Sequence, residues 1–399
     1  MSLARKSRTA LWQMQAWLSG WRCKEKIVVI ESDDWGAIRT SSRENYNFLA
    51  AAGYPMGDSV LSVDALETED DLTCLFDTLE RFKDRRGRPA CMTANMVMAN
   101  PNFEKTREAE YAEYIYEPAS ETLKRHSCRE RVGSLWKEGL SKRIFVPQFH
   151  AREHFRWWKW LEALRQNSKE AHVLFGVQMH SLPKEVSKTG ICFDGPVCVT
   201  EAEMDHYKVD IAKVICDGIN MFKAEFGGKP LSTISPSYYW TEQVERAWQN
   251  AGIKYIAGNF IQICGSTAVR RNHYTGQRNS WGGIYLVRNC NFEQNYKTTS
   301  RIKRCLQQIN SAFRNHQPAI LCSHRVNYIG SICEKNRTRG IQMLKTLLQE
   351  ITKTWPDVIF LSVPELGYMI EHDIKRIDDF NTSPEDVLLP GRKQAEAVK

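Results

Sequence analysis

Three segments of the chain end an apolar, strand-like run in acidic or histidine side chains. They are KIVVIESDDWG (26–36), RIFVPQFHAREH (143–154) and PAILCSHR (318–325). Each segment places groups that bind metals or transfer protons where a buried strand emerges into a loop, which is where barrels and open α/β sheets carry out chemistry. The side chains to be explained are those of Asp33, Asp34, His150, His154 and His324.

The HAREH motif predicts a metal site. His150 and His154 lie four residues apart, so a helix that begins at or just after His150 would place both imidazoles on one side of its first turn. There they could share a cation at about 2.0–2.1 Å, and Asp34 can supply the further ligand that a cation needs. Two histidines and a carboxylate with open coordination positions are typical of hydrolytic metal centres, although non-haem iron oxygenases use the same ligand set.

The adjacent acid, Asp33, is expected to have a separate task. Two neighbouring carboxylates on an extended chain cannot both face one cation, so Asp33 is left to orient or deprotonate a water molecule that the cation acidifies. His324, which arrives on another strand, would protonate the leaving group. An acid pair is often a turn or a helix cap, and a single histidine is often a core residue. The catalytic interpretation therefore depends on the shared placement of these residues at strand ends.

The hydrophobic pattern predicts alternating strands and helices that would position these side chains. Strands are expected at 27–30, 90–98, 145–149, 173–179, 231–234, 254–257, 319–322 and 358–361, and helices at 70–87, 155–168, 208–226, 241–251, 300–315 and 340–353. Seven or eight such units indicate a parallel α/β barrel. Residues 103–143 are charged and weakly periodic, which indicates a long insertion whose Tyr114 and Tyr116 could help to cover a site.

The rest of the chain completes the expected domain organisation. An amphipathic helix (1–24) precedes one barrel domain (25–377) with its insertion at 103–143, and a polar tail (378–399) is expected to be disordered. The 399 residues are 42% hydrophobic and 26% charged, and no apolar run approaches the length of a membrane helix. We therefore expect a soluble globular protein without a transmembrane segment.

Charge and cysteine usage indicate the partners and the compartment. The net charge of +8 comes from 55 basic and 47 acidic residues, which indicates a mixed surface and does not favour a nucleic-acid partner. The twelve cysteines form no CxxC pair, as expected in a reducing compartment. Because the N-terminus lacks a continuous apolar signal region, a cytoplasmic location is predicted. No pattern in the sequence indicates the oligomeric state.

Four motifs resemble those of polysaccharide deacetylases of the NodB-homology type. They are SDDWG (32–36), HAREH (150–154), SPSYYW (235–240) and CSHR (322–325), in the family's order, within a resemblance that runs from about Lys26 to Leu366. The resemblance implies a distorted (β/α)7–8 barrel that removes acetyl groups from N- or O-acetylated saccharides. It also implies a divalent cation, with Zn²⁺ expected and Co²⁺, Ni²⁺, Mn²⁺ or Fe²⁺ as alternatives.

The same resemblance implies a role for each matching residue. Asp33 aligns with the catalytic base and His324 with the catalytic acid, while Asp34, His150 and His154 align with the metal ligands. The backbone of Tyr238 would bind the developing oxyanion. Contacts with the substrate are expected from Tyr238, Pro236, Trp35 and Arg325.

The chain also departs from the family pattern. The first motif usually reads TFDDG, and Trp35 after the acids would narrow the pocket. No arginine precedes SPSYYW where the family has one to hold its base, so Arg39 or Arg325 would have to replace it, or the base is oriented differently. The acidic motif that supports the acid histidine is not evident, and the nearest candidate is NSWGG (279–283).

Three other functions remain open at this stage. HAREH also satisfies HxxEH, the zinc-protease signature in which Glu153 would be the general base. A barrel that binds saccharides without turnover would explain the missing arginine, and a glycoside hydrolase could use a related barrel. The favoured hypothesis is a cytoplasmic carbohydrate deacetylase that acts on a precursor of a surface polysaccharide.

Overall fold

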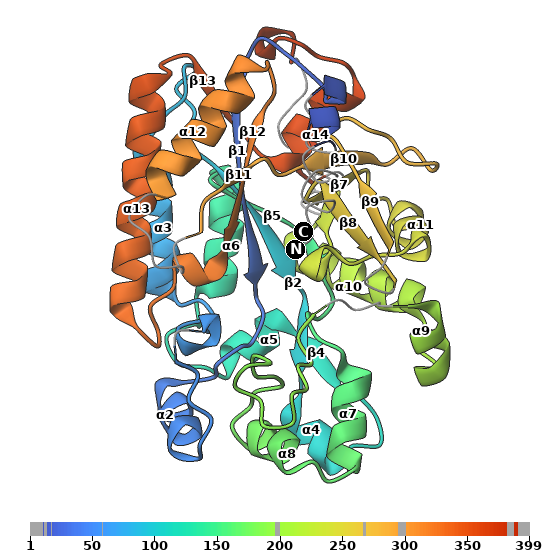
Figure 1. Cartoon of the computed structure of the whole chain (residues 1–399). Coiled ribbons are helices and arrows are strands. Elements are labelled where there is room, and N and C mark those ends of the chain that lie inside the picture. Colours follow the sequence, from blue (N-terminus) through green and yellow to red (C-terminus); the bar gives the residue numbers. More distant parts are fainter. Residues whose placement is uncertain are drawn as a thin grey trace.

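A nine-stranded parallel sheet forms the centre of the computed structural model (Figure 1). The structure describes residues 11, 14–16, 18–57, 59–195, 200–265, 269–293, 301–380 and 387–389. The strands run in the order β10 (Ile284–Val287), β7 (Tyr255–Gly258), β6 (Ser232–Ile234), β5 (Phe145–Ala151), β2 (Met92–Val97), β1 (Lys26–Trp35), β12 (Ala319–His324) and β11 (Cys290–Asn291). The ninth strand, β13 (Val358–Leu361), pairs with the first half of β1.

One segment closes this sheet into a distorted barrel. Its first half, β10, pairs with β7, and its second half, β11, pairs with β12. Between them, the Arg288 amide donates to Gly258 O at 2.9 Å and the Asn289 amide donates to Ile320 O at 3.1 Å. The ring thus consists of β1, β2, β5, β6, β7, β12 and the shared β10–β11 segment. The α/β barrel predicted from the sequence is confirmed.

Helices lie on the outside of the barrel or extend from its loops (Figure 1). Their bounds are α2 (Arg43–Ala51), α3 (Glu69–Arg81), α4 (Phe103–Glu108), α5 (Ala119–Lys124), α6 (Val132–Ser141), α7 (Trp157–Arg165), α8 (Lys169–Gly176), α9 (Glu201–Tyr207), α10 (Ile211–Phe226), α11 (Glu242–Asn250), α12 (Arg301–Arg314), α13 (Glu334–Thr354) and α14 (Val363–Glu371). Two antiparallel ribbons accompany them: β3 (Ala99–Pro101) with β4 (Tyr116–Pro118), and β8 (Ile261–Cys264) with β9 (Val269–Asn272). None of the described helices is long and apolar enough to cross a bilayer.

Local chemistry explains where a barrel helix such as α3 begins and how α6 packs. Thr68 and Asp71 form a reciprocal capping box at the start of α3, which satisfies two amide groups that the helix leaves unpaired. In α6, a Cβ atom on Gly139 would lie 2.6 Å from Phe145 Cβ. Glycine therefore lets α6 approach β5, the strand that carries His150.

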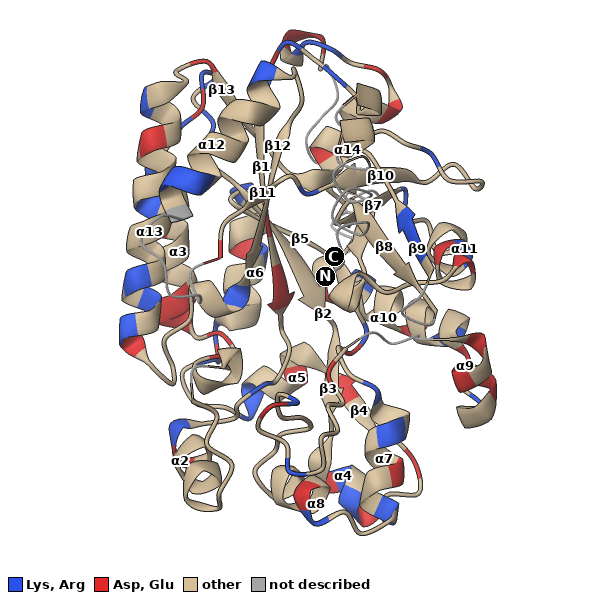
Figure 2. Ribbon diagram, in the orientation of Figure 1, with Lys and Arg blue, Asp and Glu red and all other residues tan. Residues whose placement is uncertain are grey.

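Acidic and basic side chains alternate over the outer helices. In Figure 2, Lys, Arg, Asp and Glu are interspersed along α3 and α13, and the carboxyl end of β1 inside the barrel is acidic.

Several expectations about elements need correction. Residues 173–179 do not form a strand, since residues 173–176 belong to α8, which begins where the Ser168 hydroxyl oxygen accepts a hydrogen bond from the Ala171 amide. The segment 103–143 is only partly an insertion, since α6 is the barrel helix between β2 and β5. Within the tail, Val387–Leu389 is buried rather than disordered, and Leu388 O accepts a hydrogen bond from Gln148. Residues 1–10, 381–386 and 390–399 lie outside the described residues.

Candidate metal centre and active site

The predicted site residues meet at the carboxyl ends of β1, β5 and β12. Asp33 and His324 are direct neighbours in the register of β1 and β12. The pairing of β1 with β2 shifts between Ser32 and Trp35, and Asp34 has a positive φ of 74°. This irregularity turns the carboxylates of Asp33 and Asp34 toward different partners, in line with the separate tasks expected for the two acids.

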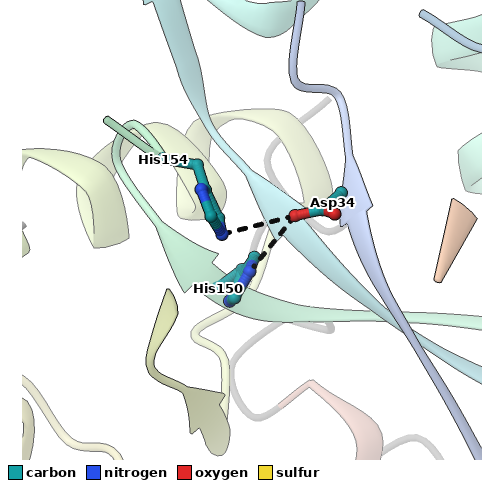
Figure 3. Close-up of side chains that lie close together, drawn as sticks. All are labelled: Asp34, His150 and His154. Carbon is teal, nitrogen blue, oxygen red and sulfur yellow. Dashed lines mark ion pairs between the residues drawn. The ribbon is translucent and has the colours of Figure 1, made fainter. Parts of the chain in front are cut away.

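Asp34, His150 and His154 converge on one point (Figure 3). Asp34 Oδ1 lies 3.5 Å from the Nε2 atom of each histidine. Two ligands at about 2.0–2.1 Å from a tetrahedral cation are separated by roughly 3.3 Å, so these distances match the spacing of metal ligands. The three residues come from β1, the end of β5 and the loop after β5.

The protonation states of the two histidines suit a cation. His150 Nδ1 lies 2.8 Å from Ile234 O, so Nδ1 carries the proton and the lone pair of Nε2 faces Asp34. Burial, together with the nearby charge of Arg39, lowers the pKa of His154 to about 4, which keeps its imidazole neutral at pH 7. Although burial raises it, Arg39 and the imidazoles hold the pKa of Asp34 well below its usual value. The donors therefore fit a divalent cation such as Zn²⁺.

The HAREH segment provides its two histidines without a helix. His150 belongs to β5, His154 lies in the following loop, and α7 begins only at Trp157. The helix expected at His150 is therefore absent. Glu153 is buried and bound by Arg152, with Nε–Oε2 and Nη2–Oε1 distances of 2.5 and 2.6 Å. This ion pair fixes the loop and fully engages the carboxylate.

Arg288, at the end of β10, holds the predicted base. It binds Asp33 in bidentate fashion, with Nη1–Oδ2 and Nη2–Oδ1 distances of 2.7 and 2.6 Å. Asn95 adds a hydrogen bond to Asp33 Oδ1 at 2.8 Å, and Arg288 also binds Glu31 at 2.8 Å. Although burial raises it, the charge and hydrogen bonds of Arg288 hold the pKa of Asp33 well below its usual value. This role of Arg288 was not predicted from the sequence.

Neither arginine that was expected to hold the base contacts it. Arg39 pairs with Asp34, Asp64 and Asp194. Arg325 is fully buried, and its guanidinium donates hydrogen bonds to Asp64, Glu67 and the Ala37 carbonyl instead. Arg325 therefore fixes the loop that follows β1. The predicted contact between Arg325 and the substrate does not fit this buried position.

Glu293, just beyond β11, supports the predicted acid. Its Oε1 atom lies 2.6 Å from His324 Nδ1, while His324 Nε2 lies 3.7 Å from Asp33 Oδ2. Burial opposes protonation of His324, but Glu293 and Asp33 raise its pKa well above the usual value. The NSWGG candidate does not have this role, because Asn279 accepts hydrogen bonds from Trp281 and Gly283 and donates to Glu245.

A cavity of about 740 Å³ opens beside His324, the predicted acid, and Arg288, which holds the predicted base. Its lining includes Tyr238, Arg288, Glu293, Cys322 and His324. Amide side chains from β11, α12 and nearby loops also line it: Asn259, Asn289, Asn291, Gln307, Gln308 and Gln317. These groups can both donate and accept hydrogen bonds, which suits a ligand rich in hydroxyl groups.

Three of the predicted substrate contacts have other positions or partners. Trp35 is fully buried, packs edge-on against Phe145 and donates to Ser32, so it lies behind the site and does not narrow the pocket. The Tyr238 amide already donates to Ser235 O at 3.0 Å, while its hydroxyl faces Arg288 at 3.4 Å. Pro236 lies with His150 in the wall of a second, smaller pocket.

Replacing Gly36 with alanine is expected to destabilise the protein and weaken its affinity for metal. Gly36 has φ +80°, and a Cβ atom there would lie 2.6 Å from Val97 O. Gly87 has φ +73° with nothing within 4 Å, so Gly87→Ala introduces the same backbone strain without the clash. We expect Gly36→Ala to lower the free energy of unfolding by about 1–3 kcal/mol more than Gly87→Ala. If chemical denaturation gave the same loss in the free energy of unfolding for both variants, the close approach of Gly36 to Val97 O would not restrict this position.

Comparisons with known proteins give only distant structural similarities. No protein-family model matches the chain. No curated protein matches it either. A Mycobacterium smegmatis protein described as a polysaccharide deacetylase has 10% identity and a TM-score of 0.43, over 88% of this chain and 93% of that one. A GH57-type branching enzyme from Pyrococcus horikoshii has 11% identity and a TM-score of 0.44, over 90% and 71% of the two chains. The α-amylase AmyC from Thermotoga maritima has 11% identity and a TM-score of 0.41, over 87% and 74%.

Proposed function

We propose that this protein is a metal-dependent hydrolase that removes acetyl groups from an N- or O-acetylated saccharide. The observation that supports it most directly is the position of Asp34 Oδ1, 3.5 Å from both histidine Nε2 atoms. A glycoside hydrolase needs two carboxyl groups and would leave this arrangement unexplained. Asp34, His150 and His154 would hold a divalent cation, which would supply Lewis acidity to the acyl carbonyl and to water.

The chain's own residues would divide the proton transfers. Asp33, kept ionised by Arg288, accepts the proton of the attacking water. His324, kept protonated by Glu293, donates a proton to the departing sugar amine or hydroxyl. Because the two groups have pKa values shifted in opposite directions, one is deprotonated and the other protonated at the same pH. That is the condition for acid–base hydrolysis.

Acetate release from acetylated hexosamine oligomers tests the proposal. The metal-loaded protein should release acetate, and Asp33→Asn should reduce the rate by about 10²–10⁴-fold while leaving the metal content unchanged. Metal and oligomer binding without acetate would indicate a barrel that only binds saccharides. An increase in reducing ends without acetate would indicate a glycoside hydrolase.

Replacing Glu153 with glutamine should leave the rate of acetate release within about tenfold of the unmodified protein. Glu153 is bound to Arg152 and does not act as the base in this mechanism, so the substitution affects only the order of the loop. A zinc protease that used Glu153 as its base would lose activity completely. Rates of acetate release and of peptide cleavage, measured on Glu153→Gln and Asp33→Asn in parallel, distinguish the two mechanisms.

A further inference from the structure

Glu293, Cys322 and His324 form a second group of possible metal ligands beside the predicted acid. One ligand atom from each residue lies within 4.8 Å of the others. Cys322 and His324 are two apart on β12 and so share one face of the strand, while Glu293 follows the neighbouring strand β11. Thiolate, imidazole and carboxylate are together a ligand set for Zn²⁺.

The distances in this group allow a cation after a small adjustment. Glu293 Oε1 lies 3.8 Å from Cys322 Sγ and 2.6 Å from His324 Nδ1. Ligands at about 2.0–2.3 Å from a tetrahedral Zn²⁺ lie roughly 3.3–3.6 Å apart. The first distance must shorten by about 0.2 Å, and the second must open by about 0.7 Å as the cation replaces the hydrogen-bonded proton.

The group is accessible, and its charge environment tolerates a cation. All three residues line the 740 Å³ cavity, so a cation can enter and keep an open coordination position toward the cavity. Burial raises the pKa of the Cys322 thiol, and the Arg288 guanidinium, with Nη1 3.4 Å from Sγ, partly opposes this shift, so the thiol gives up its proton as a cation binds. Because Arg288 is itself paired with Asp33 and Glu31, its repulsion of an incoming cation is partly offset.

We propose that Glu293, Cys322 and His324 bind a second divalent cation, with Zn²⁺ preferred over Mn²⁺, and that this binding removes His324 from proton transfer. The thiolate gives the preference, because soft ligands select Zn²⁺ whereas Mn²⁺ prefers oxygen. The first site contains no sulfur. The binding part of this proposal is independent of the proposed function, and only the resulting inhibition rests on it.

Titration of the metal-free protein with Co²⁺ and Zn²⁺ tests the second site. The unmodified protein should bind two equivalents, and its Co²⁺ form should show a thiolate-to-metal charge-transfer absorption. Cys322→Ser should bind one equivalent and lack that absorption. Cys216→Ser, which removes an exposed thiol from α10, should behave like the unmodified protein. A thermal unfolding curve for each variant confirms that it is folded.

The variants also separate this proposal from the first metal site. Asp34→Ala should retain one equivalent together with the charge-transfer absorption. If Cys322→Ser still binds two equivalents, or the unmodified protein shows no thiolate absorption at full loading, the second site is refuted while the first is unaffected. For inhibition, excess Zn²⁺ should reduce acetate release at least tenfold in the unmodified protein and less than twofold in Cys322→Ser, each relative to its own rate without excess metal. Equal inhibition of both proteins would overturn the regulatory part.

Discussion

Replacing Asp34 with alanine is expected to abolish stoichiometric metal binding at the Asp34–His150–His154 site. The carboxylate oxygen is one of the three ligand atoms of this site, and two imidazoles alone cannot complete the coordination of a catalytic cation. Loss of an outer partner of a metal ligand typically costs 10–100-fold in affinity, so loss of a ligand should cost at least about 100-fold. Competition with a chromophoric chelator measures this directly, and elemental analysis gives the stoichiometry.

His154→Ala should have the same effect, while His372→Ala is the matched control. His372 is exposed at the end of α14, and its ring packs at a tilt against that of Tyr368. Its removal should leave the metal affinity of the Asp34–His150–His154 site within twofold of that of the unmodified protein. Acetate release should fall with metal content in Asp34→Ala and His154→Ala. Full metal occupancy in either variant would remove the basis of the proposed function.

The convergence of Asp33, Asp34, His150 and His324 was predictable because the rule behind it is geometric. A parallel barrel brings the carboxyl ends of its strands to one face, so residues at three strand ends had to be near one another. The register of β1 and β12 confirms this for Asp33 and His324. The hydrophobic pattern that identifies the strands was enough to predict that these strand-end residues lie close together.

The ligand pair in HAREH was predicted from a geometry that does not occur. Spacing by four residues suggested a helix, whereas His150 ends a strand and His154 returns from a loop that Arg152 and Glu153 hold. Loop conformation depends on such tertiary ion pairs, which spacing alone does not reveal. The side chains still meet, with ring centres 5.1 Å apart.

Arg288 and Glu293 escaped prediction because β10 and β11 were not predicted. Ile284–Val287 is an apolar run that ends in a charged residue, the same pattern that identified the other three segments. It is only four residues long and follows two glycines, so it was not distinguished from loop. Applying the strand-end rule to this run would have found Arg288, the partner of the base, whereas Glu293 follows the two-residue strand β11, which has no such apolar run.

The sequence alone also could not show which buried arginine pairs with which carboxylate. Arg39, Arg288 and Arg325 are all buried beside acids, and each could have served Asp33 by charge alone. Only the path of the backbone determines which acid each one reaches. This is why Arg39 and Arg325 were plausible from the sequence and wrong in the structure.

Replacing Arg288 with methionine is expected to lower both the stability of the protein and its activity. It leaves Asp33 and Glu31 buried without their shared counter-charge, which should reduce the free energy of unfolding by about 3–5 kcal/mol near neutral pH. Because Arg288 lowers the pKa of Asp33, its removal raises that pKa, and the base becomes protonated at a higher pH. The acid limb of the pH–rate profile should therefore move to higher pH, and acetate release at neutral pH should fall by at least about 100-fold.

Two comparisons separate this role from a general loss of stability. Arg271→Met removes an exposed ion pair between Arg271 of β9 and Glu242 of α11, and should change the free energy of unfolding by at most about 1 kcal/mol without moving the pH profile. Adding Glu31→Gln to Arg288→Met removes one of the two stranded carboxylates, so part of the stability should return while the acid limb stays displaced. If that limb remained at its original pH in Arg288→Met, Asp33 would not be the base whose ionisation Arg288 maintains.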